Sequence, residues 1–146
     1  GTGSFVNFNL QATAIYKPNF QQTTSTSTYG TSSTSYVDVS GMSVSITPAS
    51  ISSSIRICCY FTTAGGNTQS YDITRNGTSL SSGVGMAFCD PNSVGPKIPI
   101  GINFIDSPSS VSSQTYQLRF KTGDGSNPAS FNSTSYLVAI SAEQLN

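Results

Sequence analysis

The fold of this chain is decided by the stretch NFIDSPSSVSSQTYQLRFKTGDGS, residues 103–126. Its first part predicts a strand that ends at Pro108, because proline has no N–H for a strand ladder. From Thr115 to Lys121, apolar and polar residues alternate strictly, which is typical of an antiparallel strand with one buried face. The polar segment Ser109–Ser113 between them has the length of a connection between neighbouring strands. The stretch therefore predicts antiparallel β-structure.

The composition extends this prediction to the whole chain. Its 146 residues suit a single domain, 1–146, with a buried core. Charged residues make up 8% of the chain, against about 25% in ordinary soluble proteins, whereas there are 28 serines and 17 threonines. These residues disfavour helix interiors and suit strands and turns. Disorder is the alternative for such a composition, but apolar residues recur at period two in segment after segment, so we expect an all-β domain.

The charge pattern excludes several classes of function. The net charge is zero, there is no histidine, and the six cations are scattered, which argues against a nucleic-acid partner. No apolar run approaches about 18 residues and no basic-then-apolar leader is visible, so we expect no membrane span and no signal peptide. Weak self-repulsion suits a protein that lives in an assembly.

Local signals place several strands. The pair Asn76-Gly77 between two strand-like runs predicts a type I′ hairpin over Ser70–Leu80. Pro99 confines the strand Lys97–Phe104 to the edge of a sheet. Two segments, Ile55–Phe61 and Ser135–Ser141, read as interior strands, and the second is apolar on both faces.

Near the N-terminus, Phe5–Ile15 alternates and predicts a long first strand. The Ser/Thr-rich tract Gln21–Ser35 has no apolar period and is interpreted as a long loop or a mobile edge. Asp90–Pro96 is interpreted as a second loop. With about ten short strands in all, the sequence predicts an antiparallel two-sheet jelly-roll sandwich.

No arrangement of residues indicates catalysis. Without histidine, acid–base chemistry would rest on six dispersed carboxylates. Asp106, before Ser-Pro at a strand end, is interpreted as a turn residue that bonds its own backbone. The segment Asp124–Asn127 resembles a calcium loop but lacks its spaced acids and distal glutamate, so a turn is expected. We expect no enzyme activity, no metal and no cofactor.

The three cysteines leave two alternatives open. Cys58 and Cys59 are adjacent on a predicted strand and point to opposite faces, so they cannot easily serve one partner. The first alternative is buried free thiols that act as small apolar residues. The second is a bridge from Cys89 to Cys59 or Cys58.

If the chain recognises a partner, the two predicted loops are the candidate surface, since binding residues gather on loops held by rigid sheets. Tyr29 is interpreted as an exposed aromatic ring beside hydroxyls and amides, a mixture that suits a glycan or a protein partner. Thr28 and Thr31 beside it, and Asn92 in the second loop, are the further polar candidates. The alternative interpretation of the first loop is a connector without a binding role.

Five segments resemble a family of phage and marine-virus virion domains with trimeric C1q/TNF-like jelly-roll heads. They are YVDVSGMSVSITP (36–48), YDITRNGT (71–78), FIDSP (104–108), TY (115–116) and AISAE (139–143). The resemblance implies a non-enzymatic, homotrimeric protein on the surface of a virus particle, with its C-terminal strand near the threefold axis. Family heads commonly sit on a stalk, but no heptad or Gly-X-Y repeat is visible here.

The resemblance leaves two roles open, capsid decoration (head fibre) and the tip of a fibre that attaches to the host. The partners it implies are copies of the same chain, other virion proteins, and a host glycan or receptor. A cellular carbohydrate-binding or C1q-like recognition module is the alternative from another class. An enzyme such as a depolymerase has little support, because the carboxylates are so few.

Overall fold

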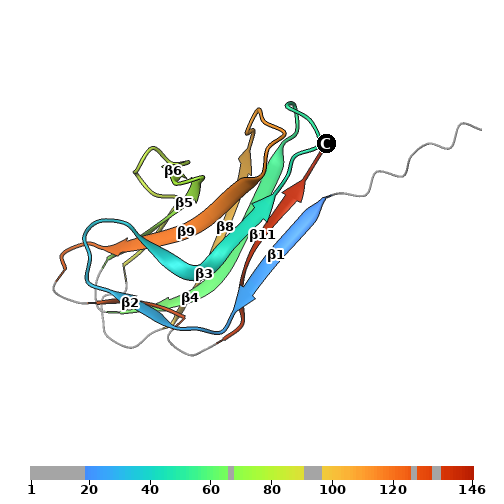
Figure 1. Ribbon diagram of the computed structural model, residues 1–146. Coiled ribbons are helices and arrows are strands. Elements are labelled where there is room, and N and C mark those ends of the chain that lie inside the picture. Colours follow the sequence, from blue (N-terminus) through green and yellow to red (C-terminus); the bar gives the residue numbers. More distant parts are fainter. Residues whose placement is uncertain (1–18, 66–67, 91–96, 126–127, 133–135) are drawn as a thin grey trace, which may run out of the picture.

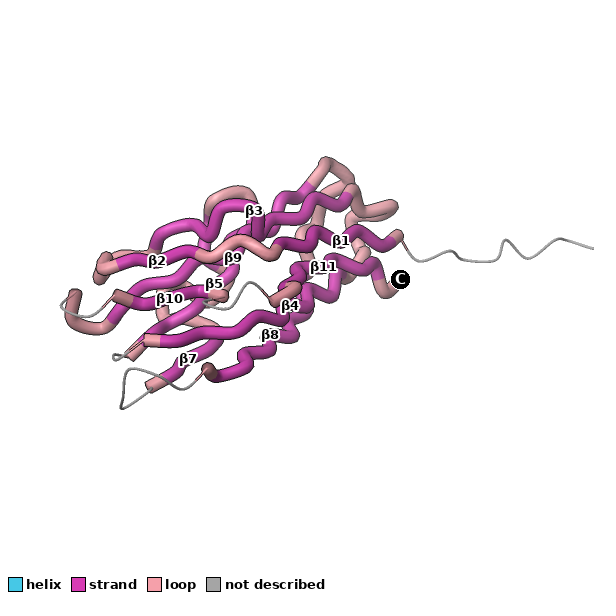
Figure 2. Tube along the Cα trace, turned by 90° about the horizontal axis from the view of Figure 1, so that it is seen from below, coloured by secondary structure: helices cyan, strands magenta, loops and turns pink. Residues whose placement is uncertain are grey.

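A computed structural model describes residues 19–65, 68–90, 97–125, 128–132 and 136–146. These residues form two antiparallel sheets packed face to face (Figure 1). Strands, turns and loops account for all of them, with no helix in the described part of the chain (Figure 2). The predicted all-β, two-sheet fold is confirmed.

The larger sheet, sheet A, is organised around one long strand. Its members are β1 (Phe20–Ser25), β2 (Tyr29–Thr31), β4 (Ile55–Ala64), β8 (Ile98–Asp106), β10 (Ala129–Phe131) and β11 (Val138–Gln144). The long strand β4 pairs with β8 on one side and with β11 and then β10 on the other. Because β1 pairs with β11 and β2 with β10, the sheet is four strands wide.

The smaller sheet, sheet B, is also four strands wide. It contains β3 (Val37–Ile46), β5 (Gln69–Arg75), β6 (Thr78–Ser79), β7 (Ala87–Cys89) and β9 (Gln114–Thr122). The order is β3, β9, β5, after which β6 and β7 pair with the two ends of β5. The chain passes from one sheet to the other between β2 and β3, β3 and β4, β4 and β5, β7 and β8, β8 and β9, and β9 and β10. Two facing four-strand sheets with this alternation form a jelly roll.

An aromatic cluster fills the interior, because alternate residues of both sheets point inward. The Phe61 ring of β4 lies 4.7 Å from the Tyr71 ring of β5 and 5.1 Å from that of Phe131. The buried Tyr71 hydroxyl donates to Gln69 Oε1 at 2.6 Å and also contacts the Thr63 hydroxyl of β4. This closed polar group joins the two sheets without leaving the phenol unpaired in the core.

The predicted hairpin is confirmed. β5 and β6 pair from Thr74 to Ser79, and the turn residues Asn76 and Gly77 have φ values of 50° and 83°. Positive φ at both positions is the signature of a type I′ turn. The Asn76 side chain also donates to Gln114 Oε1 and accepts from the Thr115 N–H, so the turn is tied to β9.

Replacing Gly77 with Ala tests the turn against a matched glycine. A Cβ added at Gly77, or at Gly101 of β8, would meet no described atom within 4 Å. Of these two glycines, only Gly77 has a positive φ. We expect Gly77→Ala to cost about 1–2 kcal/mol in free energy of unfolding, because an L-residue is strained there. Gly101→Ala should be neutral or slightly stabilising. Urea titration measures both, and equal effects would contradict the turn geometry.

The interpretation of Pro99 is also confirmed. β8 is an edge strand that pairs with β4 alone, with Pro99 opposite Thr62. The strands of the opening stretch, β8 and β9, belong to different sheets, so residues 107–113 cross from one layer to the other. Spacing could not show this crossing, because a connection of that length serves either purpose.

The interpretation of Gln21–Ser35 as a long loop is wrong, whereas its alternative, a sheet edge, is confirmed. β1, which begins at Phe20, and β2 run through this tract at the edge of sheet A and pair with β11 and β10. The tract lacks an apolar period because the side chains of β1 are mostly exposed at a sheet edge, where backbone pairing carries the strand. The predicted strand Phe5–Ile15 and most of the predicted loop Asp90–Pro96 lie outside the described residues.

The C-terminal strand is interior, as predicted, but its bounds and its outward face differ. β11 lies between β1 and β4 and begins at Val138. Its outward residues, Ala139, Ser141 and Glu143, are small or polar. The apolar residues Tyr136 and Leu137 precede the strand and are exposed. The interior position of β11 therefore depends on pairing at both edges rather than on two apolar faces.

Candidate recognition site

Of the four residues that the sequence offered for recognition, the structure describes Thr28, Tyr29 and Thr31. The Tyr29 ring is partly buried and lies 6.0 Å from the Phe131 ring, packed against the core. Thr28 is exposed beside it, Thr31 is half-buried, and Asn92 lies outside the described residues. The interpretation of Tyr29 as an exposed ring is wrong, because β2 turns alternate side chains towards the interior.

Replacing Tyr29 with Ala should therefore destabilise the fold. We expect a loss of about 1–3 kcal/mol in free energy of unfolding, less than for a fully buried ring because Tyr29 is partly exposed. Thr28→Ala, at the exposed neighbouring position, should change stability by less than about 0.5 kcal/mol. Thermal or urea denaturation compares the two, and an unchanged Tyr29→Ala variant would contradict the packing.

On the outer face of sheet B, a carboxylate is buried under a covering segment. Asp72 of β5 lies opposite Arg119 of β9 and accepts two hydrogen bonds from its guanidinium, at 2.9 and 2.6 Å. Ser79 donates to the same carboxylate oxygen at 2.7 Å. Although this is the solvent side of the sheet, the Asp72 side chain is fully buried. We call residues 80–86, which join β6 to β7, the covering segment, because Ser81 within it also hydrogen-bonds to Asp72.

Burial by itself would raise the pKa of Asp72, as desolvation disfavours a charged carboxylate. Hydrogen bonds from Ser81, Ser79 and Arg119, together with the guanidinium charge, outweigh it and hold the pKa below its ordinary value. Asp72 is thus an ionised anchor at neutral pH. It fixes the covering segment to the sheet.

A second carboxylate is buried at the end of β8, where a turn residue was predicted. Asp106 accepts two hydrogen bonds from Arg75, at 2.8 and 2.7 Å, and one from the Tyr116 hydroxyl at 2.8 Å. Burial and the neighbouring Asp106 carboxylate both raise the pKa of Tyr116. The turn interpretation is wrong, because the Asp106 oxygens accept hydrogen bonds from Arg75 of β5 and Tyr116 of β9. Asp106 therefore joins β8 to these two strands of the other sheet.

Asp106→Asn tests this bridge between the sheets. Removing one partner of a largely buried ion pair leaves Arg75 and Tyr116 poorly matched, and we expect a loss of about 2–4 kcal/mol in free energy of unfolding. Glu143→Gln is the matched control, since the pair of Glu143 with Arg56 is solvent-exposed and spans 3.4 Å. That change should cost less than about 1 kcal/mol. Equal losses in urea titrations would contradict the structural role of Asp106.

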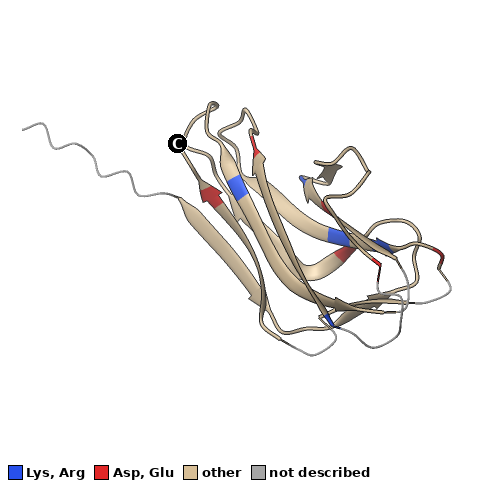
Figure 3. Cartoon of the chain, turned by 180° about the vertical axis from the view of Figure 1, so that it is seen from behind, with Lys and Arg blue, Asp and Glu red and all other residues tan. Residues whose placement is uncertain are grey.

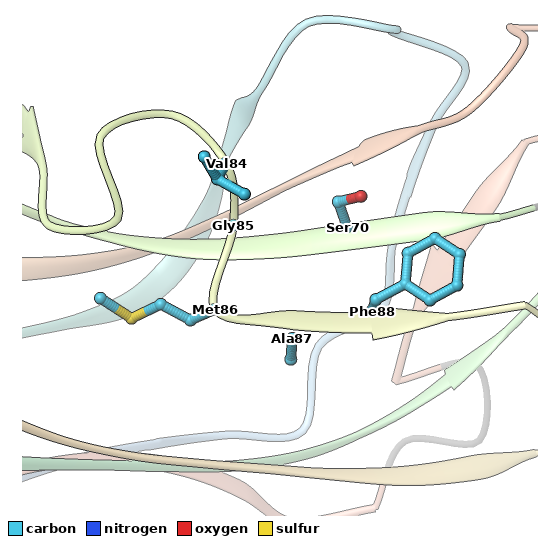
Figure 4. A pocket seen from close by; sticks show the side chains of 6 residues that line it. All are labelled: Ser70, Val84, Gly85, Met86, Ala87 and Phe88. Carbon is cyan, nitrogen blue, oxygen red and sulfur yellow. The ribbon is translucent and has the colours of Figure 1, made fainter.

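Beside the covering segment lies a pocket of about 300 Å³ (Figure 4). It is lined by Ser70, Val84, Gly85, Met86, Ala87 and Phe88. The Tyr36 hydroxyl donates to the Val84 carbonyl at 3.3 Å and lies 2.6 Å from where a Cβ at Gly85 would be. Glycine at position 85 therefore lets the Tyr36 phenol reach the pocket wall. No sequence pattern indicated this pocket, because strand register brings Ser70 beside Phe88.

The outer face of sheet A has a different character. The register aligns Phe20, Glu143, Arg56 and Ile105 in one row across four strands, and Ala139, Tyr60 and Gly101 in another. Phe20, Tyr60 and Ile105 are each exposed by more than half. Small and uncharged residues surround Tyr60, and most of the ribbon in Figure 3 is neutral. This surface, which we call the sheet A face, is flat and weakly charged.

The cysteines are free thiols in the structure. Cys59 and Cys89 are buried, and Cys58 is half-buried on the sheet A face. Burial raises the pKa of Cys59 to about 12, so its thiol stays protonated and unreactive at neutral pH. The prediction of buried free thiols is confirmed for Cys59 and Cys89.

In the described ranges, no group of three or more His, Cys, Asp or Glu residues could hold a metal ion. No helix in the same ranges is long and apolar enough to cross a membrane.

Comparison with known proteins yields likenesses to solved structures alone. No family model matches the chain, and no curated protein matches it. Among solved structures, the chain is similar to one titled "Structure of infectious bursal disease virus Gx strain", with 11% sequence identity and a TM-score of 0.48. The match covers 88% of this chain and 37% of that one. A likeness of this degree supports no conclusion about the partners or the activity of this chain.

Proposed function

We propose that this chain is a non-enzymatic structural protein of a virus particle, displayed on the particle surface and associated there with copies of itself. Two features support the proposal. The sequence of residues 36–143 resembles virion domains with trimeric jelly-roll heads, and the jelly roll is an architecture that viral capsid proteins use. Capsid decoration and a fibre tip are the two roles that this proposal covers.

The observation that carries the proposal is the sheet A face. Tyr60 is exposed among small neutral side chains, and Phe20 and Ile105 are exposed at the two ends of the row that holds Glu143 and Arg56. Large apolar side chains exposed on a surface with few charges favour burial against another protein. The adjacent Arg56 and Glu143 carry opposite charges, so a second copy can oppose this face without like-charge repulsion.

A catalytic role has no comparable support. Both buried carboxylates, Asp72 and Asp106, are neutralised by an arginine and act as structural links. General acid–base work needs titratable groups that can reach a substrate, and the Asp72 side chain is fully buried.

Light scattering of the purified chain tests self-association. We expect a mass of three copies, and we expect Tyr60→Ser to weaken association at least about tenfold, because a central aromatic contact typically dominates an interface. Val111→Ser is the matched control: Val111 is 55% exposed, close to the 57% of Tyr60, but lies in the β8–β9 connection. It should leave association unchanged.

A mass of 15.3 kDa, that of one chain, at all concentrations and in the absence of a companion protein would contradict self-association. Electron microscopy of particles labelled with an antibody to the chain tests the location. Label on capsids supports decoration, label at fibre ends supports a tip, and unlabelled particles contradict the virion proposal.

A further inference from the structure

We propose that the pocket between β5 and the Val84–Phe88 segment binds one N-acetylated hexose residue of a glycan. This proposal concerns the outer face of sheet B, opposite the sheet A face, and does not depend on self-association. It follows from the size of the pocket, its mixture of apolar and hydroxyl groups, and the rigidity of its wall.

Two lining residues of the pocket, Ser70 and Phe88, belong to one row of side chains across sheet B. Ser70 of β5 lies directly between Lys121 of β9 and Phe88 of β7, so all three side chains emerge on the same face. The Lys121 ammonium lies 4.8 Å from the centre of the Tyr36 ring, which extends the row. In Figure 4 the Ser70 hydroxyl and the Phe88 ring stand side by side at the pocket.

The size limits the ligand to a single small ring. A volume of about 300 Å³ is at the lower end of ligand pockets, which span roughly 300–1,000 Å³. A drug-sized molecule or a long acyl chain therefore does not fit, whereas one hexose residue does. The rest of a glycan would remain in solvent.

The lining fits a ligand with both apolar and hydroxyl surfaces. Phe88, which is 64% exposed, offers a flat ring against which the C–H face of a sugar can stack. The Ser70 hydroxyl provides a hydrogen-bond donor and acceptor. Val84, which is 82% exposed, and the partly buried Met86 add apolar surface at the pocket, against which the methyl of an acetamido group can pack. No charged side chain lines the pocket in the described residues, so a neutral sugar is favoured over an anionic ligand.

The wall is held before any ligand arrives. Ser79 and Ser81 accept hydrogen bonds from the Gly83 and Gly85 N–H groups, both at 2.8 Å, and Ser79 is anchored in turn to Asp72. Tyr36 fixes the Val84 carbonyl from the other side. A preformed wall loses little conformational entropy on binding, which permits useful affinity for a small ligand.

Titration of the ¹⁵N-labelled full chain with N-acetylglucosamine, followed by NMR, tests the proposal. We expect shift changes at residues 70 and 84–88 with a dissociation constant on the order of 1 mM, as a small neutral ligand allows. Glucose, which lacks the acetamido group, should bind at least about tenfold more weakly.

Phe88→Ala should weaken binding at least about tenfold, because it removes the stacking surface. Val111→Ala, another exposed apolar position outside the pocket, should bind as the unchanged chain does. Phe88 is exposed, so the fold should persist, and Ser70→Ala supplies a second variant with the same expected direction. No shifts at about 50 mM sugar, shifts confined to other residues, equal binding of glucose, or unaltered binding by both variants would each overturn the proposal.

Discussion

The sandwich depends on the contact between β4 and β5 across its interior. Phe61 and Tyr71 meet there at 4.7 Å, and the Tyr71 hydroxyl is paired with Gln69 and Thr63 in the same place. A buried hydroxyl without a partner would cost about 1–3 kcal/mol. The Tyr71 ring can therefore be buried here because its hydroxyl is paired with Thr63 and Gln69. β4 pairs with three strands of sheet A and β5 with three strands of sheet B, so this contact lies between the most connected strand of each sheet.

The two outer faces are consequences of that arrangement, and they differ. Sheet A leaves its outer face uncovered, so Tyr60 stands on a flat neutral surface suited to a protein partner. Sheet B is partly covered by the segment between β6 and β7, which Asp72 holds in place. The covering segment creates a pocket beside Phe88. One face is therefore suited to assembly, and the other to recognition of a small group.

Sequence reasoning succeeded where one residue type has one conformational meaning. Asn76 with Gly77 determined the hairpin, and Pro99 determined an edge strand. It failed where backbone pairing or a distant partner determines the structure. Residues 20–31 form edge strands that show no apolar period. Asp106 binds an arginine 31 residues away in the sequence. The pocket at Phe88 could not be predicted for the same reason, because strand register brings Ser70 beside Phe88.

The contact between β4 and β5 is tested most directly by the unfolding free energy of Tyr71→Phe. This change keeps the ring in place and removes only the hydroxyl that Thr63 and Gln69 share. The account predicts a loss of about 1–2 kcal/mol in urea titrations, because the remaining buried polar groups lose a partner. A variant as stable as the unchanged chain, or more stable, would contradict the claim that this polar closure holds the two sheets together.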